Sequence, residues 1–410
     1  MNDVLTLLQS RGFFQQCTDV ALLKEKLNKG ELRFYCGFDP TGPSLHCGHL
    51  VPLFAMAHLQ KAGHRPIALV GGGTARIGDP SGKSEMRKML TVKEVQANAE
   101  SIKKQIERFI SFDNDRAILA DNANWLSDLN YIDFLREIGR HFSVNRMLTF
   151  ESYKKRLETG LSFIEFNYQL LQSYDFLTLR RKYDCELQIG GDDQWGNIVA
   201  GLDLIRRLDG IECVGLTFPL VTRSDGKKMG KTEKGAIFLD PTLTSVYDFF
   251  QYWRNVADAD VEKFLKLYTF LSVQECETLG RKTDSQINKS KEILAYELTK
   301  IIHGKEEADK ALAAAHAAFG GASGDKEGMP SLSISASEIE SVISIIDIFA
   351  KSSLCSSRSE ARRLIEQGGA KINDLQISDL DYIVTNTDIK DGDIILKAGK
   401  KRFFRIKISD

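Results

Sequence analysis

The stretch from Tyr35 to His49 most restricts how this chain can fold. Residues 32–38 are mainly apolar or aromatic, which predicts a strand, and residues 39–43 read D-P-T-G-P, which predicts a turn. From Ser44 onward apolar residues recur at helical spacing until Gly63, which predicts a helix. A strand, a turn and a helix in this order form the first unit of an α/β fold, with a ligand site at the turn.

Two histidines, His46 and His49, fall in the predicted first turn of that helix. Their spacing puts both rings on one face, beside unpaired backbone N–H groups and the positive end of the helix dipole. Imidazole donors there suit phosphate oxygens, and Gly48 lets a ligand approach the backbone closely. A surface pair and a metal site that includes Cys47 are the alternatives. No CxxC motif or second histidine cluster completes a ligand set, so we expect no metal site.

The order of strand, glycine and helix recurs through the first 222 residues. Further strands are predicted at residues 65–70, 116–120, 185–189 and 214–221. Helices are predicted between them at residues 91–110, 131–157, 162–179 and 198–208. This alternation predicts an α/β fold, a Rossmann-like parallel sheet with helices on both faces, whose site lies at the carboxyl ends of the strands.

A glycine-rich segment, residues 71–84, follows the strand at 65–70. A phosphate-binding P-loop needs a glycine five residues before Gly82, but position 77 is Ile. A shortened loop would not wrap phosphates with the same N–H groups. We therefore reject the P-loop and expect a mobile loop that carries Lys83 and Arg87 towards a substrate.

Polar residues mark two further elements. On the helix predicted over 162–179, Tyr168, Gln172 and Asp175 fall at i, i+4 and i+7 and form a polar stripe without Lys or Glu. The stripe could be a solvated face or could orient a small polar ligand. Asp193 follows the strand at 185–189, where an acid commonly holds ribose hydroxyls, although a helix cap is the alternative.

The loop after the strand at 214–221 is basic and contains glycines. It reads T-R-S-D-G-K-K-M-G-K-T from Thr222 to Thr232. A run of charge is normally a solvated loop. Lysines around a glycine are also able to clamp a leaving pyrophosphate, so both interpretations stand at this point.

With H-C-G-H early and K-M-G-K-T late, the chain resembles the class I aminoacyl-tRNA synthetases, whose HIGH and KMSKS signatures occur in this order. The segments G-F-D-P-T, I-G-D-P-S-G-K, N-Y-Q-L-L-Q-S-Y-D and G-G-D-D-Q-W-G-N-I are similar to the bacterial tyrosyl-tRNA synthetases, and the resemblance covers essentially the whole chain. Two departures are visible. Asp192 replaces the usual serine of G-G-S-D-Q, which puts an extra carboxylate beside the ribose site, and Gly230 differs from the KMSKS consensus, as is common in the tyrosyl subgroup.

The resemblance implies a role for each matching residue. Tyrosine would be bound by Tyr35 and Asp175 at its phenol, by Asp79, Tyr168 and Gln172 at its α-amino group, and by Gln194 near its carboxylate. ATP would be bound by Gly37, Asp39, Thr41, His46, His49, Asp193 and Lys231. The catalytic set would be His46 and His49 together with loop residues that close on pyrophosphate, Lys83, Arg87, Lys228, Lys231 and Thr232.

The chemistry that the resemblance implies needs no covalent protein nucleophile. The tyrosine carboxylate attacks the α-phosphorus of ATP, and the protein positions both groups and stabilises charge on pyrophosphate. We expect ATP as a substrate with Mg²⁺ and no permanently bound cofactor. The implied partners are L-tyrosine, ATP, the tRNA for tyrosine and a second copy of the chain, through the helical region after Tyr131.

The remainder of the chain is expected to serve tRNA. After the catalytic domain (1–222), the resemblance implies the signature loop and a helical anticodon-contacting domain (223–319). A Gly/Ser linker (320–334) and a small α+β RNA-binding domain (335–410) are expected to follow. The segment S-S-R-S-E-A-R-R-L-I-E-Q-G-G-A-K-I-N-D resembles a domain shared with a ribosomal protein and some pseudouridine synthases. RNA contacts are expected from Arg358, Arg362, Arg363, Lys400 and Lys401, with a solvated basic face as the alternative.

Composition limits the remaining possibilities. A chain of 410 residues with 42% hydrophobic residues suits two or three domains. The net charge of −1 means that RNA binding must depend on local patches. Seven scattered cysteines, no signal-peptide pattern and no run long enough to span a bilayer predict a cytoplasmic protein without a membrane partner.

Three other kinds of protein share part of these features. A tryptophanyl-tRNA synthetase shares the fold, but Asp175 facing Tyr35 favours a phenol. A small HxGH nucleotidyltransferase would need neither K-M-G-K-T nor an RNA module. An RNA-binding relative without catalysis would not need to keep both signatures.

Overall fold

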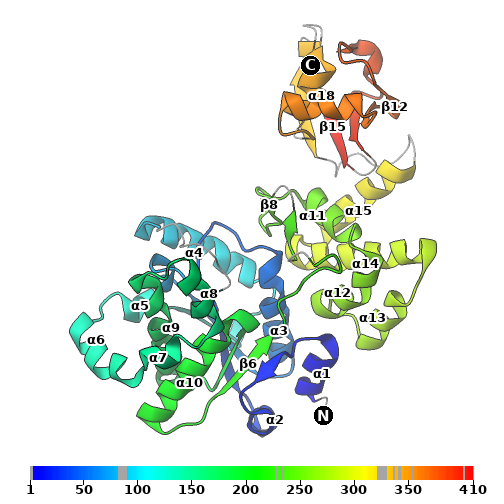
Figure 1. Ribbon diagram of the computed structural model, residues 1–410. Coiled ribbons are helices and arrows are strands. Elements are labelled where there is room, and N and C mark those ends of the chain that lie inside the picture. Colours follow the sequence, from blue (N-terminus) through cyan, green and yellow to red (C-terminus); the bar gives the residue numbers. More distant parts are fainter. Residues whose placement is uncertain are drawn as a thin grey trace. The chain divides into compact units, whose positions relative to one another are not determined.

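The computed structural model describes residues 3–81, 90–226, 229–232, 235–320, 330–335, 338–339, 343–352, 354–399 and 402–409. The chain forms two compact units (Figure 1). The first contains residues 1–244 and 253–302, and the second contains residues 245–252 and 303–410. Of the helices in the described ranges, none has the length and hydropathy that a bilayer span requires.

A six-stranded sheet forms the centre of the first unit, in the order β1-β6-β5-β2-β3-β4. Its strands are β1 (Gln16–Cys17), β2 (Arg33–Phe38), β3 (Arg65–Val70), β4 (Ile118–Asp121), β5 (Leu187–Gly191) and β6 (Val214–Phe218). Strands β2 to β6 are parallel, which confirms the predicted α/β class, and β1 pairs antiparallel with β6 at the edge. The strand order runs outward in opposite directions from β2 and β5. Their carboxyl ends are therefore the topological switch point, the usual place for a ligand.

Helices surround this sheet (Figure 1). They are α1 (Val4–Arg11), α2 (Val20–Lys29), α3 (Leu50–Lys61), α4 (Val92–Ile106), α5 (Ala123–Leu126), α6 (Tyr131–Glu137), α7 (Val144–Met147), α8 (Glu151–Thr159), α9 (Phe163–Tyr183) and α10 (Trp195–Asp209). Capping boxes start α4 (Thr91 with Glu94) and α9 (Ser162 with Glu165), each satisfying backbone N–H groups that the helix leaves unpaired.

The prediction of a single helix over residues 131–157 is wrong. The chain there forms α6, α7 and α8, separated by extended backbone at Phe142, Ser143 and Phe150. Phe142 and Phe150 pack against the hydrophobic core of the first unit. Burial of these rings outweighs the weak helical preference of the segment, so periodicity alone could not locate the breaks.

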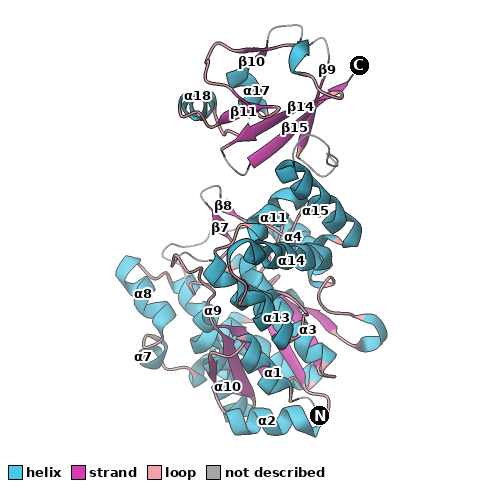
Figure 2. Cartoon of the chain, turned by 90° about the vertical axis from the view of Figure 1, so that its right-hand side faces the viewer, coloured by secondary structure: helices cyan, strands magenta, loops and turns pink. Residues whose placement is uncertain are grey.

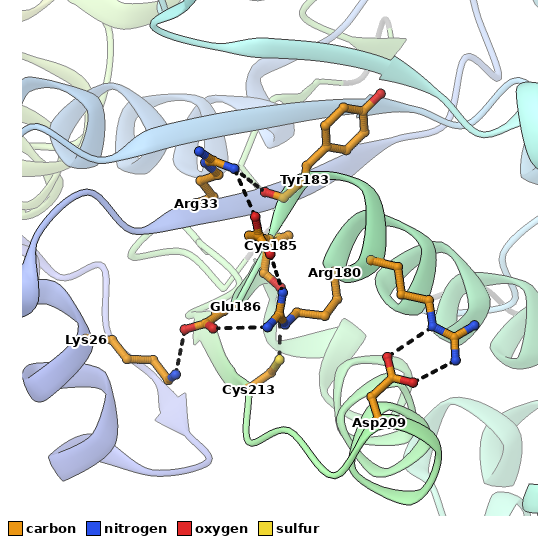
Figure 3. Close-up of polar contacts among 10 residues, drawn as sticks. Lys26, Arg33, Arg180, Tyr183, Cys185, Glu186, Asp209 and Cys213 are labelled. Atoms are coloured by element: carbon orange, nitrogen blue, oxygen red, sulfur yellow. Dashed lines mark hydrogen bonds and ion pairs between the residues drawn. The ribbon is translucent and has the colours of Figure 1, made fainter.

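The end of α9 is fixed to the sheet by a polar cluster (Figure 3). Arg33, the first residue of β2, donates to the carbonyl oxygen of Tyr183 at 3.1 Å. Glu186, just before β5, pairs with Lys26 at 2.6 Å and lies 3.6 Å from Arg180. Because the cluster joins α9 to the starts of β2 and β5, it sets the position of α9 over the two central strands.

Helices follow the sheet, as predicted for residues 244–319. The first unit contains α12 (Val261–Tyr268), α13 (Val273–Gly280) and most of α14 (Asp284–His303), while most of α11 (Val246–Arg254) and all of α15 (Lys305–Gly320) belong to the second. Trp253 packs against Tyr268 and Phe264, with ring centroids 5.1 Å and 5.9 Å apart.

The C-terminal part has its own sheet and core (Figure 2). Five strands lie in the order β12-β11-β14-β15-β9. The elements are β9 (Ser331–Ser335), β10 (Ile343–Ser344), α17 (Ile345–Lys351), α18 (Arg358–Glu366), β11 (Ala370–Ile372), β12 (Leu375–Gln376), β13 (Ile383–Val384), β14 (Asp393–Ala398) and β15 (Arg402–Ser409). The predicted linker end at residue 334 is wrong, because Ser331–Ser335 pair in parallel with β15. Glycine and serine content suggested a linker, but Ile334 of this strand is buried in the hydrophobic core of the C-terminal part.

Candidate active site

The H-C-G-H segment forms a tight turn just before α3, in the connection from β2 to α3. The helix predicted from Ser44 starts later, because His46 is extended, residues 47–49 form a 3₁₀ turn and α3 begins at Leu50. The two rings are still neighbours, with centroids 4.2 Å apart. Nδ1 of His46 accepts from Gly48 N at 3.0 Å, and Nδ1 of His49 accepts from His46 N at 3.2 Å. In the neutral rings the proton therefore lies on Nε2, which makes Nε2 the donor towards an anionic oxygen.

The polar stripe of α9 faces the protein interior and not solvent. Tyr168 and Asp175 are buried. The two carboxylate oxygens of Asp175 accept from Asn122 Nδ2 at 2.8 Å and from Trp125 Nε1 at 2.7 Å. Gln172 Oε1 accepts from Asn197 Nδ2 at 3.0 Å. The solvated-face interpretation of the stripe is therefore wrong.

The hydroxyl of Tyr35 is the distinctive group of this region. Tyr35 lies in β2, is only 1% exposed and stacks at a tilt on Phe176 with centroids 5.2 Å apart. Its hydroxyl is buried and has no hydrogen-bond partner among the described residues. Burial, followed by the charge of Asp175, raises the pKa of Tyr35 well above its usual value, so this hydroxyl keeps its proton and needs an acceptor.

Burial also dominates the ionisation of Asp175. It raises the pKa of this carboxyl to about 8, against the lowering effect of the hydrogen bonds from Asn122 and Trp125. The nearby carboxylates Asp39 and Asp121 raise the pKa further. A donor brought against Asp175 by a ligand would offset this cost of burying a charge.

A second network lies beside the first. Asp79 accepts from Gln194 Nε2 at 2.7 Å and from the backbone N of Ser81 at 2.9 Å. Asn197 donates to Gln194 Oε1 at 3.1 Å as well as to Gln172. This network joins the glycine-rich segment, α9 and the turn after β5, and it brings together three residues assigned by the resemblance to the amino and carboxylate groups of tyrosine.

Asp39 links the end of β2 to α9. Its carboxylate accepts from Tyr168 Oη and from Thr74 Oγ1, both at 2.7 Å. A Cβ atom at Gly71 would lie 1.9 Å from Asp39 Oδ1, so glycine is required there for close approach. Gly37, in β2, and Thr41, two residues after Asp39, are exposed beside this link.

Four polar residues whose side chains take part in these networks were not identified from the sequence: Thr74, Asn122, Trp125 and Asn197. Asn122 donates to both Thr74 Oγ1 and Asp175, so it connects the two sides of the site. One signal was available, because Asn122 directly follows β4 and polar residues at the carboxyl ends of parallel strands gather at one edge.

A 3₁₀ turn, Asp192–Gln194, follows β5. Asp192 Oδ1 accepts from Gln16 Nε2 at 2.8 Å and from Thr217 Oγ1 at 2.9 Å, so the extra carboxylate is tied to β1 and β6. Asp193 is not the N-cap of either helical segment here, since Gly191 and Gln194 hold those positions. The helix-cap alternative for Asp193 is therefore excluded.

The remaining predicted residues are only partly described. Lys83, Arg87, Lys228, Lys400 and Lys401 lie outside the described residues. Lys231 and Thr232 form β7, paired with β8 (Gly235–Ala236). Within the described ranges, no group of three or more His, Cys, Asp or Glu side chains is placed to hold a metal ion. A cavity of about 620 Å³ between α1, α3 and Phe270 contains none of the predicted site residues.

On α18 all three predicted arginines are exposed. Arg358 pairs with Asp347 at 2.6 Å. Two basic residues of β15 are used within the domain: Arg402 donates to the carbonyl oxygen of Leu354, and Arg405 pairs with the buried Asp393 at 2.8 Å. Of the three predicted arginines on α18, Arg362 and Arg363 are therefore the two that are exposed and make no ion pair with another described residue.

Family models match both parts of the chain. Residues 27–320 match the model of tRNA synthetases class I (W and Y). The chain belongs to this family. Residues 323–406 of this synthetase match the model of the tyrosine–tRNA ligase SYY-like C-terminal domain. The predicted class of enzyme, an aminoacyl-tRNA ligase, is thereby confirmed.

Relatives of this synthetase match it over its length. The tyrosine–tRNA ligase of Treponema denticola is 61% identical over 410 residues, 100% of both chains. That of Treponema pallidum is 56% identical over 407 residues, 99% of this chain and 98% of the relative. A solved structure, the C-terminally truncated mitochondrial tyrosyl-tRNA synthetase of Aspergillus nidulans, is 29% identical with a TM-score of 0.68, covering 76% of this chain and 93% of that one.

Proposed function

We propose that this synthetase activates L-tyrosine with ATP and transfers the tyrosyl group to the 3′ end of its tRNA. The observation that carries the proposal is the buried Tyr35 hydroxyl without a described partner beside the buried carboxylate of Asp175. A phenol hydroxyl satisfies both, because its oxygen accepts from Tyr35 while its proton is donated to Asp175. The relatives named tyrosine–tRNA ligase support the same substrate.

Tryptophan, the other amino acid of the family, fits this pair less well. An indole N–H is a donor only, so it would bond Asp175 but leave the Tyr35 hydroxyl without an acceptor. A buried hydroxyl left unpaired costs about 1–3 kcal/mol, which favours tyrosine.

The other residues are proposed to have the roles that the resemblance implies. Asp79, Tyr168 and Gln172 hold the α-amino group and Gln194 lies near the carboxylate. His46 and His49, after β2, and Asp193, after β5, lie at the switch point where nucleotides bind, with Gly37, Asp39 and Thr41 beside them. Lys83, Arg87, Lys228, Lys231 and Thr232 act on pyrophosphate, and Mg²⁺ enters with ATP.

Pyrophosphate exchange into ATP, run separately with each of the twenty amino acids, tests the proposal. Exchange should occur with tyrosine and not with tryptophan. Exchange with tryptophan alone, or with no amino acid, would contradict it. The second outcome would instead favour the RNA-binding relative without catalysis.

Arg362 and Arg363 are proposed to bind tRNA phosphates. Replacing both by alanine should leave tyrosine activation unchanged and weaken aminoacylation. The dependence of log affinity for tRNA on log salt should become shallower by roughly 0.7–0.9 per lost contact. Lys104→Ala, an exposed lysine on α4, is the control. An unchanged salt dependence in the double variant would exclude these contacts.

We further propose that the protein is a cytoplasmic homodimer. Exposed apolar side chains gather on the segment from α6 to the start of α9: Tyr131, Ile132, Val144, Leu157 and Phe163. A concentration of exposed large apolar side chains in one segment commonly marks an interface between subunits.

Phe163→Asp should therefore produce monomers in sedimentation experiments at concentrations where the unaltered chain is dimeric. Phe163 is 70% exposed, so the substitution removes no core packing. Leu375→Asp is the matched control, because Leu375 is 67% exposed and lies in β12. A dimeric Phe163→Asp variant would place the interface elsewhere.

A further inference from the structure

Gly230, in the K-M-G-K-T segment, lies directly against the H-C-G-H turn. A Cβ atom at Gly230 would lie 2.7 Å from Cys47 Cβ and 3.6 Å from Gly48 N. The φ angle of Gly230 is 76°, a left-handed conformation that residues with side chains rarely adopt. The serine of the KMSKS consensus would not fit here without a shift, which gives a physical reason for the departure seen in the sequence.

Backbone hydrogen bonds join the same two segments through residues 237–239, here called the connector. Ile237 N donates to the carbonyl oxygen of Gly230 at 2.9 Å, and Cys47 N donates to the carbonyl oxygen of Ile237 at 3.0 Å. Leu239 N donates to the carbonyl oxygen of Leu45 at 2.9 Å. The connector therefore holds Gly230 and the H-C-G-H turn in one hydrogen-bonded arrangement.

The loop before Gly230 is anchored separately. The backbone N and Oγ of Ser224 donate to the buried carboxylate of Asp260 at 3.0–3.1 Å. Met229 N donates to the carbonyl oxygen of Val221 at 3.0 Å. With Ser224 and Met229 fixed on one side and the connector on the other, an added atom at Gly230 has to displace Gly230 or the H-C-G-H turn.

We infer that Gly230 is a positioning residue: its missing side chain sets the distance between the two signature segments and thereby the position of Lys231. The inference rests on the proposed function, in which Lys231 stabilises charge on pyrophosphate. A displacement of about 1 Å in a catalytic arrangement is able to lower the rate on the order of 10²-fold. Gly230 would thus control the rate without touching a substrate.

A matched pair of glycines tests this. Gly226 has nearly the same φ angle, 78°, but a Cβ there would meet no atom within 4 Å. Both glycine-to-alanine changes therefore put a side chain at nearly the same positive φ angle, and only Gly230→Ala adds the contact with Cys47. In pyrophosphate exchange by the full chain, Gly230→Ala should lower kcat about 10²-fold with the KM for tyrosine unchanged, and Gly226→Ala less than about tenfold.

Cys47 provides the second test, because the close contact is with its Cβ and not its sulfur. Cys47→Gly in the Gly230→Ala background should restore kcat at least about tenfold relative to Gly230→Ala, after correction for the effect of Cys47→Gly alone. Cys47→Ala keeps the Cβ atom and should not restore kcat. Tyrosine affinity, measured by equilibrium dialysis, should be unchanged in every variant and shows that each one is folded.

The outcomes separate the inference from the function it rests on. Equal losses for Gly230→Ala and Gly226→Ala, equal rescue by glycine and alanine at position 47, or loss of tyrosine affinity in Gly230→Ala would overturn the inference. If one of these outcomes is found and Lys231→Ala still lowers kcat, only the role of Gly230 is wrong. A normal kcat for Lys231→Ala would instead remove the proposed role of the loop.

Discussion

Replacing Asp175 by alanine should abolish most of the preference of this synthetase for tyrosine over phenylalanine. Phenylalanine has no hydroxyl, so it would bring no donor to the buried Asp175 and no acceptor to the buried Tyr35 hydroxyl. Tyrosyl-tRNA synthetase is the standard example of such rejection, at about 10⁵-fold. Without the carboxylate that rejection should disappear from the ratio of the two kcat/KM values in pyrophosphate exchange.

Two further variants sharpen this test. Asp175→Asn keeps the shape but turns an NH₂ group towards Asn122 or Trp125, which are both donors, so it should also lose selectivity. Tyr35→Phe removes one neutral hydrogen bond and should lower kcat/KM for tyrosine only about tenfold. Phenylalanine is the internal control, since its kcat/KM should hold or rise. Full selectivity in both Asp175 variants would show that the phenol lies elsewhere.

Helices and strands that carry a sustained pattern of apolar residues were predictable from the sequence. β3 lies where it was predicted, at residues 65–70, because a buried parallel strand is a continuous apolar run. β1 was missed, since two residues carry no pattern and their pairing with β6 depends on a partner about 200 residues away. The breaks around Phe142 and Phe150 were missed for a related reason, because core packing and not local propensity decides them.

The candidate site shows the same division. His46, His49, Tyr168 and Asp175 were found because spacing within one turn or one helix brings them together. The partners of Asp175 come from α5 and the residue before it, about 50 residues away, so no local pattern relates them. Burial, which raises the pKa of Asp175 to about 8, is a property of the fold and follows from no single segment.

Lys231 is expected to act mainly in the transition state of tyrosine activation. It follows Gly230, which lies against the H-C-G-H turn, so its backbone is held beside the place where we propose that ATP phosphates bind. A cation there interacts more strongly with pyrophosphate as its charge develops than with bound ATP, and it has no contact with tyrosine in this proposal.

Lys231→Ala should therefore lower kcat for activation about 10²-fold or more, with the KM for tyrosine nearly unchanged. Lys231→Arg keeps the charge but not the compact ammonium group, so it should recover part of the rate. Lys104→Ala, the exposed lysine of α4, should leave both constants unchanged and controls for loss of charge as such. A rise in KM as large as the expected fall in kcat, with kcat itself unchanged, would mean that Lys231 binds the ground state as strongly as the transition state. Lys231 would then be a binding residue and not a catalytic one.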